Sequence, residues 1–312
     1  MALGLSFMKH FPHIIIIIAV ALALFAGKAA AQSRYPEIKI APAVKEAKKA
    51  ASDSTGYEER PYFLLIDQCE KAMAEHDYEA AGLRLVEAMA VEPDNPLNVA
   101  LLANLGMIYY YNEQDSMALV TLDHVIQRSP RLLAGHENRA RVLTGMGRDR
   151  EAFEEYGKVI ELDSINADAR FYHGMMALYG GDMRTAEADF ATLQRVVPLW
   201  SNTTLALATL YSMTGRDREA IPLFRKLLET DKYAEYYAAL AGCLLATDNH
   251  TEASKVIGEG LERYPKDPEL YYYRAMLNHL RFMEDEAQRD ARTAIQLGAS
   301  PQKVARIFGG RK

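Results

Sequence analysis

Histidine, cysteine and carboxylate side chains are the residues of this 312-residue chain that could hold a metal or move a proton. No two histidines stand four residues apart with a glutamate between them, the spacing that sets two zinc ligands and a base on one helix face. The histidines that follow Ala31 are His76, His124, His136, His173, His250 and His279. Because they are scattered along the chain, we expect structural or solvent-exposed roles for them and no metal.

Nucleophile turns and phosphate-binding loops are also missing from the sequence. No serine stands in a Gly-x-Ser-x-Gly turn, and no glycine-rich loop ends in Lys-Ser or Lys-Thr. Acidic neighbours such as Glu154 and Glu155 fall on a predicted helix surface, where we expect solvated charge. The sequence therefore predicts no catalytic residue, no cofactor and no enzyme.

The charge balance argues against a nucleic-acid partner. The chain carries a net charge of −6, which becomes −8 if residues 1–31, with two lysines and no acid, are removed. An acidic chain lacks the positive surface that a phosphate backbone requires. With about half of its residues hydrophobic, the chain can still bury a sizeable core.

Residues 1–31 are typical of a cleaved signal peptide. An apolar run from Ile14 to Phe25 follows Lys9, and small residues precede a predicted cut after Ala31. The run is shorter than the ~20 residues that span a bilayer, so we expect only transient membrane contact. We therefore predict an exported protein, periplasmic or secreted, of a Gram-negative bacterium; an uncleaved membrane anchor is the alternative.

Residues 32–61 are polar and contain several prolines, which predicts a linker with one short helix near Val44 to Ala51. Two Asp-Ser-x tripeptides in the rest of the chain, starting at Asp115 and Asp163, and one in the linker, starting at Asp53, resemble an O-glycosylation acceptor of exported proteins. Helix caps and turns are the favoured interpretation of all three.

From residue 62 onward the sequence repeats itself. The hexapeptide GRDREA occurs at Gly147–Ala152 and again at Gly215–Ala220, and Ala186 lies midway between the two final alanines. The same register gives Ala81, Ala118, Ala152, Ala186, Ala220, Ala253 and Ala287. A small residue stands 12 places before each alanine, and a large apolar residue stands four places after six of them. Small residues where two helices cross let the backbones approach closely, so the pattern predicts repeated helix pairs.

This pattern of a small residue, a later alanine, an apolar side chain and a terminal proline resembles the tetratricopeptide repeat family. The best matches are Leu105–Tyr109 with Ala118 and Pro130, and His173–Ala177 with Ala186 and Pro198. The resemblance implies an all-α, right-handed α-α superhelix, a solenoid of about seven repeats over residues 62–301. Residues 302–312 would form a C-terminal capping helix and tail after Ser300-Pro301.

In this fold GRDREA becomes the turn between the two helices of a repeat. Gly147 and Gly215 suit the left-handed residue that ends a first helix, and Asp149 and Asp217 suit the N-cap of a second helix. Cys69 and Cys243 fall near crossing positions of different repeats, so we expect buried, free thiols.

The resemblance also implies a binding groove, because in that family ligand contacts cluster at fixed places of each first helix. Here those places carry mostly aromatic and methionine side chains, which suit apolar or adaptable partners. The residues are Met107, Tyr110, Tyr111, Arg141, Phe171, Met175, Tyr179, Met213, Tyr272 and Met276. The lysine clamp by which some members hold an acidic chain end is missing.

We therefore interpret the sequence as a non-enzymatic scaffold or assembly factor of the cell envelope that binds a protein or peptide partner in this groove. Several alternatives stay open. The aromatic residues could pack between repeats, or residues 32–60 could fill the groove. The protein could also be a membrane-anchored adaptor, or bind envelope glycans on the same aromatic rings.

Overall fold

The computed structural model describes residues 40, 42–52 and 60–309, and the expected signal peptide lies outside them. Over these residues the chain forms sixteen α-helices and no strand, which confirms the all-α repeat fold. The helices are α3 (Pro42–Ser52), α4 (Pro61–Ala74), α5 (Tyr78–Val91), α6 (Asn98–Tyr111), α7 (Asp115–Arg128), α8 (Leu133–Gly145), α9 (Asp149–Leu162), α10 (Ala167–Gly180), α11 (Met183–Val196), α12 (Ser201–Met213), α13 (Asp217–Thr230), α14 (Ala234–Ala246), α15 (His250–Arg263), α16 (Pro268–Leu280), α17 (Glu284–Gln296) and α18 (Pro301–Ala305).

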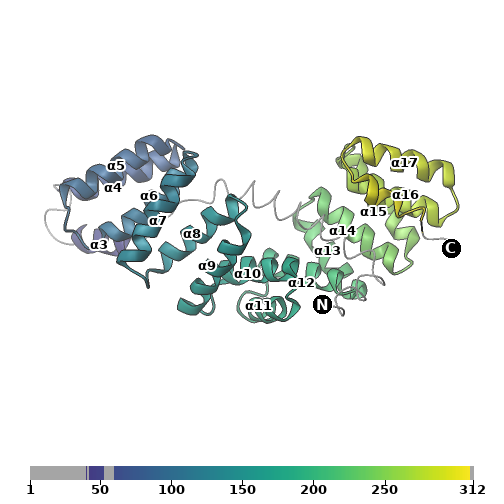
Figure 1. The fold of residues 1–312 in the computed structure, drawn as a ribbon, viewed down its shortest axis with the longest axis horizontal. Helices are drawn as coiled ribbons and strands as arrows, with labels where there is room; N and C mark the ends of the chain where they lie inside the picture. Colours follow the sequence, from purple (N-terminus) through teal and green to yellow (C-terminus); the bar gives the residue numbers. More distant parts are fainter. Residues whose placement is uncertain (1–39, 41, 53–59, 310–312) are drawn as a thin grey trace. The chain divides into compact units, whose positions relative to one another are not determined.

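From α4 to α17 these helices form seven successive helix–turn–helix repeats (Figure 1). The described residues divide into two compact units, an N-terminal unit that ends at Met176 and a C-terminal unit that begins at Ala177. In the N-terminal unit α4 packs on α5, α6 on α7 and α8 on α9; in the C-terminal unit α12 packs on α13, α14 on α15 and α16 on α17.

The same turn joins the two helices of every repeat. One residue of this turn has a positive φ in all seven repeats: His76, Glu113, Gly147, Gly181, Gly215, Asp248 and Phe282. The amide that follows donates to the carbonyl five residues earlier, as Arg148 N does to Leu143 O at 2.9 Å. This hydrogen bond closes the end of a helix around a left-handed residue, which confirms the predicted role of the two GRDREA glycines.

The N-cap prediction for the same hexapeptide is wrong by one residue. Asp149 and Asp217 are the first helical residues, and the N-caps are Arg148 and Arg216, whose side chains do not cap. Each arginine instead pairs with the glutamate three residues later; Arg148 Nε and Nη2 lie 2.7 Å from the two oxygens of Glu151. A bidentate arginine–carboxylate pair thus stands at the start of each of these second helices, which have no side-chain N-cap.

The predicted crossing positions form the core of the repeats. All seven alanines are fully buried, and six of the seven residues four places later are large and apolar, as in Leu85, Leu122 and Phe190. A methyl group on Gly106 of α6 would lie 2.6 Å from Leu122 Cγ of α7, so these helices cross too closely for a side chain there. Cys69 and Cys243 are buried and free, as predicted.

The prediction that the Glu154–Glu155 pair is solvated is wrong for Glu155. Its carboxylate is almost fully buried between α8 and α9, whereas Glu154 is exposed. Glu155 Oε1 accepts hydrogen bonds from Lys158 Nζ at 2.8 Å and Arg139 Nη1 at 3.0 Å. Its Oε2 lies 2.8 Å from His136 Nδ1, and the other ring nitrogen lies 3.0 Å from the Pro130 carbonyl oxygen. Lys158 and Arg139 compensate the buried charge, and the His136 ring completes the contacts of the carboxylate.

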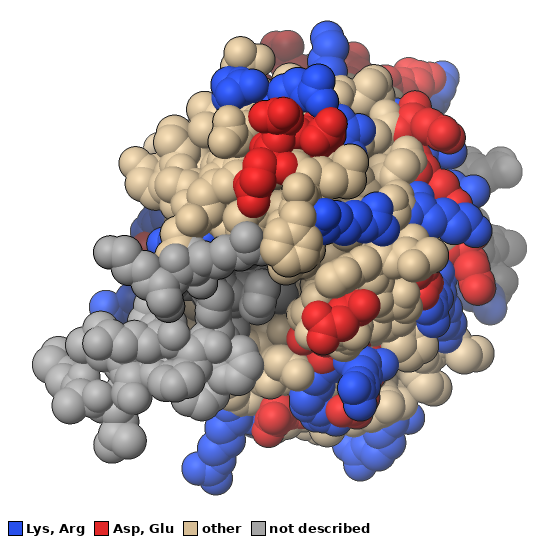
Figure 2. All heavy atoms as spheres, turned by 90° about the vertical axis from the view of Figure 1, so that its right-hand side faces the viewer, with Lys and Arg blue, Asp and Glu red and all other residues tan. Residues whose placement is uncertain are grey.

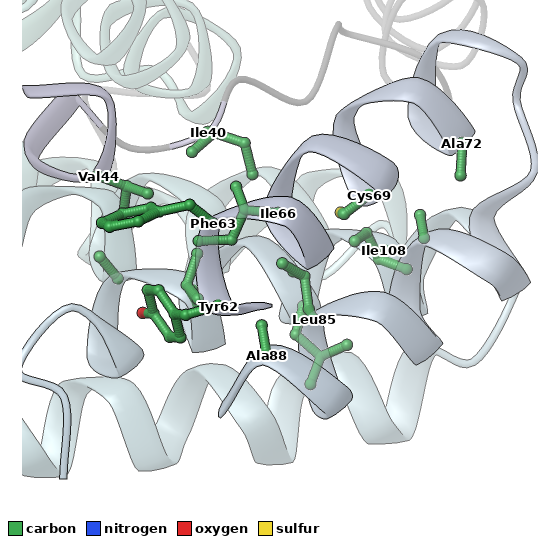
Figure 3. Packing of buried hydrophobic residues seen from close by; sticks show 14 residues of the cluster. Ile40, Val44, Tyr62, Phe63, Ile66, Cys69, Ala72, Leu85, Ala88 and Ile108 are labelled. Atoms are coloured by element: carbon green, nitrogen blue, oxygen red, sulfur yellow. The ribbon is translucent and has the colours of Figure 1, made fainter. Parts of the chain in front are cut away.

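A helix also precedes the first repeat. The short helix that the sequence suggested near Val44 to Ala51 is α3, and it lies against α4 (Figure 3). Ile40, just before α3, and Val44, on it, are buried with Phe63 and Ile66 of α4. Ile40 and α3 are therefore packed on the first repeat.

At the other end of the chain, α18 follows the seventh repeat. Ser300 is its N-cap and accepts from the Lys303 amide, and Pro301 opens the helix, as the sequence suggested. Val304 and Ile307 are buried, so this segment covers apolar surface at the end of the C-terminal unit.

Candidate partner-binding surface

The structure buries most of the ten side chains that the sequence placed in a binding groove. Seven are less than a tenth exposed: Met107, Tyr110, Tyr111, Phe171, Met175, Met213 and Tyr272. Arg141, Tyr179 and Met276 are partly exposed. Contact of the ten with a partner stays a prediction, and the three partly exposed side chains are the ones that solvent reaches most easily.

Neighbouring repeats cover the tyrosines of α6. The Tyr110 hydroxyl reaches the backbone of α8 so closely that a Cβ on Gly145 would lie 1.8 Å from it. Tyr111 stacks obliquely on Tyr78 of α5, with ring centroids 5.0 Å apart, and contacts the Tyr110 ring at 5.7 Å. With Met107 these rings form one buried cluster, so in the N-terminal unit the packing that we considered for Tyr110 does occur.

Arg141 is the polar residue of the predicted set, and α8 holds it at the edge of α10. Its Nη2 lies 3.3 Å from Asp168 Oδ2, and the two side chains are 31% and 51% exposed. One turn earlier on α8, Glu137 Oε1 accepts from Asn166 Nδ2 at 2.7 Å. Two polar contacts thus join α8 to the start of α10.

Tyr156 and Tyr172 lie close enough to Arg141 to interact with its charge. Tyr172 of α10 stacks on Tyr156 of α9 at 5.3 Å and meets Phe171 edge-on at 5.2 Å. Burial lowers the pKa of Arg141, but Asp168 and the neighbouring groups outweigh it and raise the pKa overall, so the guanidinium stays charged. Burial also raises the pKa of Tyr111, an effect that the Arg141 charge opposes.

We call Arg141, Asp168, Glu137, Asn166 and Tyr172 the α8–α10 patch. A guanidinium carries five N–H donors, and in the described part of the chain Arg141 uses one of them on Asp168. A partly exposed arginine near aromatic rings can donate hydrogen bonds to a carboxylate or a carbonyl oxygen of a bound chain. The fixed groove places pointed to Arg141, but the spacing alone did not show that Asp168 would pair with it or that Asn166 would hydrogen-bond Glu137 from the next repeat.

In the C-terminal unit, Tyr272 on α16 is covered by the capping helix. Lys303 of α18 lies over its ring, with Nζ 4.4 Å from the centroid, and also pairs with Glu269. Burial lowers the pKa of Lys303, and the nearby Glu269 carboxylate opposes this effect. Met276, one turn further along α16, keeps partial exposure.

Three further observations bear on the surface. Seen from the side where α15 to α17 lie, acidic and basic side chains are interspersed (Figure 2). Among residues 40, 42–52 and 60–309, no cluster of three His, Cys, Asp or Glu side chains could hold a metal ion. Within the same residues, every helix is too short or too polar to cross a membrane.

The repeats are similar to those of known proteins. The family model described as tetratricopeptide repeat matches residues 214–277. Among curated proteins, the human mitochondrial import receptor subunit TOM70 is 24% identical over 202 residues, which cover 62% of this chain. The match spans 31% of the length of that receptor subunit.

Solved structures resemble a larger part of the chain. A tetratricopeptide repeat protein from Parabacteroides merdae superposes with a TM-score of 0.59 at 23% identity, covering 80% of this chain and 98% of that one. The APC/C hetero-tetramer Cut9–Hcn1 superposes with a TM-score of 0.57 at 12% identity, covering 90% of this chain and 61% of that one. At these identities the likeness concerns the fold.

Proposed function

We propose that this chain, which belongs to the tetratricopeptide-repeat proteins, is a non-enzymatic scaffold that binds a protein or peptide partner through the first helices of its repeats. The fold supports the general role of a protein-interaction scaffold. A stack of helix pairs offers a continuous surface rather than an enclosed pocket, which suits an extended or helical ligand.

The observation that carries the proposal is the exposure of Arg141 beside Asp168. The buried tyrosines and methionines fix the first helices in place, and the α8–α10 patch leaves a charged group open to solvent between two repeats. We infer that a partner places a carboxylate or a main-chain carbonyl on Arg141 and apolar atoms against Tyr172. The buried aromatic residues would then act as the rigid backing of the surface.

We also propose that the protein works in the cell envelope. This part of the proposal is supported by the sequence of residues 1–31 alone, with its apolar run and small residues before Gln32. The mass of the chain purified from its native source tests it. A mature protein that begins at Gln32 is expected, and a chain that retains residue 1 would contradict export by this route.

A photo-crosslink inside the cell tests partner binding. Benzoylphenylalanine replaces Tyr172 or Tyr179 with a ring of related shape, and both side chains are partly exposed on α10. Arg150, whose side chain is 92% exposed on α9, provides the control position. A protein captured from either tyrosine and absent from Arg150 is the expected result. Equal capture from all three positions would contradict a partner site on the first helices.

A further inference from the structure

The helix α3 lies on a surface that corresponds to the predicted groove. Phe171 and Met175, two of the predicted groove residues, precede the buried Ala186 in the fourth repeat. Ile66 and Glu70 of α4 occupy the same two places relative to the buried Ala81 in the first repeat. The first repeat therefore uses its groove positions to hold a segment of the same chain, the alternative that the sequence had left open.

The contact between α3 and α4 has an apolar part and a polar part, and the apolar part involves Ile40 and Val44. Figure 3 shows Val44 beside the Phe63 ring and Ile40 above Ile66. Both aliphatic side chains are fully or almost fully buried, and Ala47 packs partly against the same cluster. The opposite face of α3, with Lys45, Glu46, Lys49 and Ala50, is exposed. Among the described side chains of α3, those that contact α4 lie along one face of the helix.

The polar half of the contact is a lysine between two carboxylates. Lys48 Nζ pairs with Asp67 and lies 3.2 Å from Glu70 Oε2. Burial lowers the pKa of Lys48, but the hydrogen bonds to the two carboxylates outweigh it and raise the pKa overall. The side chains remain a quarter to two fifths exposed, so water and competing cations reach them.

A helix of eleven residues is too short to be stable alone in water, so α3 depends on this contact. Among the described side chains, the contact comprises the buried Ile40 and Val44, the partly buried Ala47 and the partly exposed ion pairs of Lys48. Each helix of the repeats buries more side chains than this. A segment held so lightly opens more readily than the repeats beneath it.

We propose that the surface formed by Phe63, Ile66, Asp67 and Glu70 is a docking site for a basic amphipathic helix, and that α3 is its tethered competitor. The partner helix would present an aliphatic side chain in the place of Val44 and a lysine in the place of Lys48. A further aliphatic side chain just before that helix would take the place of Ile40. The apolar side chains of α4 favour aliphatic residues and its two carboxylates favour a lysine, and the packing of α3 shows how such a helix fits. The inference rests on the proposed function and names the class of partner that binds at the first repeat.

The experiment uses the full chain and a fluorescein-labelled peptide of residues 38–52. Val44→Asp places a charge on the buried face of α3 and frees α4 without altering it. The peptide is expected to bind the Val44→Asp chain at least tenfold more tightly than the unaltered chain. A peptide with Lys48→Glu is expected to lose this binding and to regain it on a Val44→Asp chain that also carries Asp67→Lys and Glu70→Lys.

A second peptide separates recognition of chemistry from recognition of one sequence. It keeps Ile40, Val44, Ala47 and Lys48 and replaces the exposed residues of α3. Binding within threefold of the native peptide is expected. If only the native sequence binds, α3 is a fixed part of the fold and the claim of a partner helix is overturned.

Circular dichroism shows whether the Val44→Asp chain keeps its helices. If it does and no peptide binds, or if both chains bind equally, the inference is overturned. If the substitution unfolds the repeats, a Lys48→Glu chain, which leaves Val44 in place, is used instead. Its peptide binding is then compared with that of the unaltered chain in the same way. The photo-crosslinks from Tyr172 and Tyr179 do not depend on α4, so capture there without peptide binding would refute this inference and leave the proposed function standing.

Discussion

Replacement of Glu155 by alanine should destabilise α8 and α9 strongly. Its carboxylate is 4% exposed and contacts three basic groups. The lost hydrogen bond to buried His136 should cost about 1.5–3 kcal/mol, since one partner is charged. Arg139 keeps its pair with Asp123, and Lys158 is half exposed, so each of these adds about 1 kcal/mol or less after screening. We expect a loss of about 3 kcal/mol.

Repeat stacks open locally, so native-state hydrogen exchange at the amides of α8 and α9 is the appropriate assay. About 3 kcal/mol corresponds to exchange faster by roughly two orders of magnitude. The matched control is Glu154→Ala, one residue away on the same helix, where the exposed pair with Arg150 should contribute about 0.5 kcal/mol or less. Exchange in the two variants that agrees within threefold would refute the reasoning.

The same carboxylate predicts a pH dependence. Burial raises the pKa of Glu155, but hydrogen bonds from Lys158 and His136 and the charge of Arg139 outweigh it, so the pKa is lowered below 4.5. A depressed folded-state pKa stabilises the fold above the unfolded value, and this stabilisation is lost as the pH falls through the folded pKa. Below about pH 4.5 the amides of α8 and α9 should therefore lose protection in the natural chain, and the Glu155→Ala chain should lack this component.

Three further outcomes follow from packing, backbone geometry and burial. Gly145→Ala should lower the free energy of unfolding in urea by about 1–3 kcal/mol, because its methyl group would meet the Tyr110 hydroxyl. Adding Tyr110→Leu to this chain should reduce the loss. At the left-handed turn position, φ is 58° at Glu113 and 70° at Gly147. Glu113→Gly should therefore stabilise the fold and Gly147→Ala should destabilise it, each by about 1 kcal/mol, and the melting temperature should rise and fall accordingly. Burial raises the pKa of the Cys69 thiol to about 12, so a disulfide reagent at pH 8 should label neither cysteine until the chain unfolds.

The repeat register was predictable because it depends on residue size at fixed spacing. A buried alanine between crossing helices tolerates little else, and a left-handed turn favours glycine, so Ala152 and Gly147 mark their positions in the sequence. The turns at His76, Glu113, Asp248 and Phe282 have no glycine at this position, and only the alignment with the other repeats identifies them. Local composition alone would have missed these four turns.

The surface was harder to predict because burial depends on contacts between repeats. A tyrosine at a groove position faces solvent only when the next helix leaves it uncovered, and Gly145 instead lets Tyr110 lie against α8. Glu155 looked like a solvent-exposed charge because its partners His136 and Arg139 stand 19 and 16 residues away. The docking of α3 depends on Lys48 meeting Asp67 and Glu70 across the linker, and no periodicity signals that contact.

The central claim is that the partner binds the first helices through Arg141. The most direct measurement is the yield of the photo-crosslink from Tyr172 in chains that carry Arg141→Glu or Arg150→Glu. Loss of a charge-assisted hydrogen bond of about 1.5–3 kcal/mol should lower the yield at least tenfold in the Arg141→Glu chain and leave it unchanged in the Arg150→Glu chain. An unchanged yield in the folded Arg141→Glu chain would contradict the account.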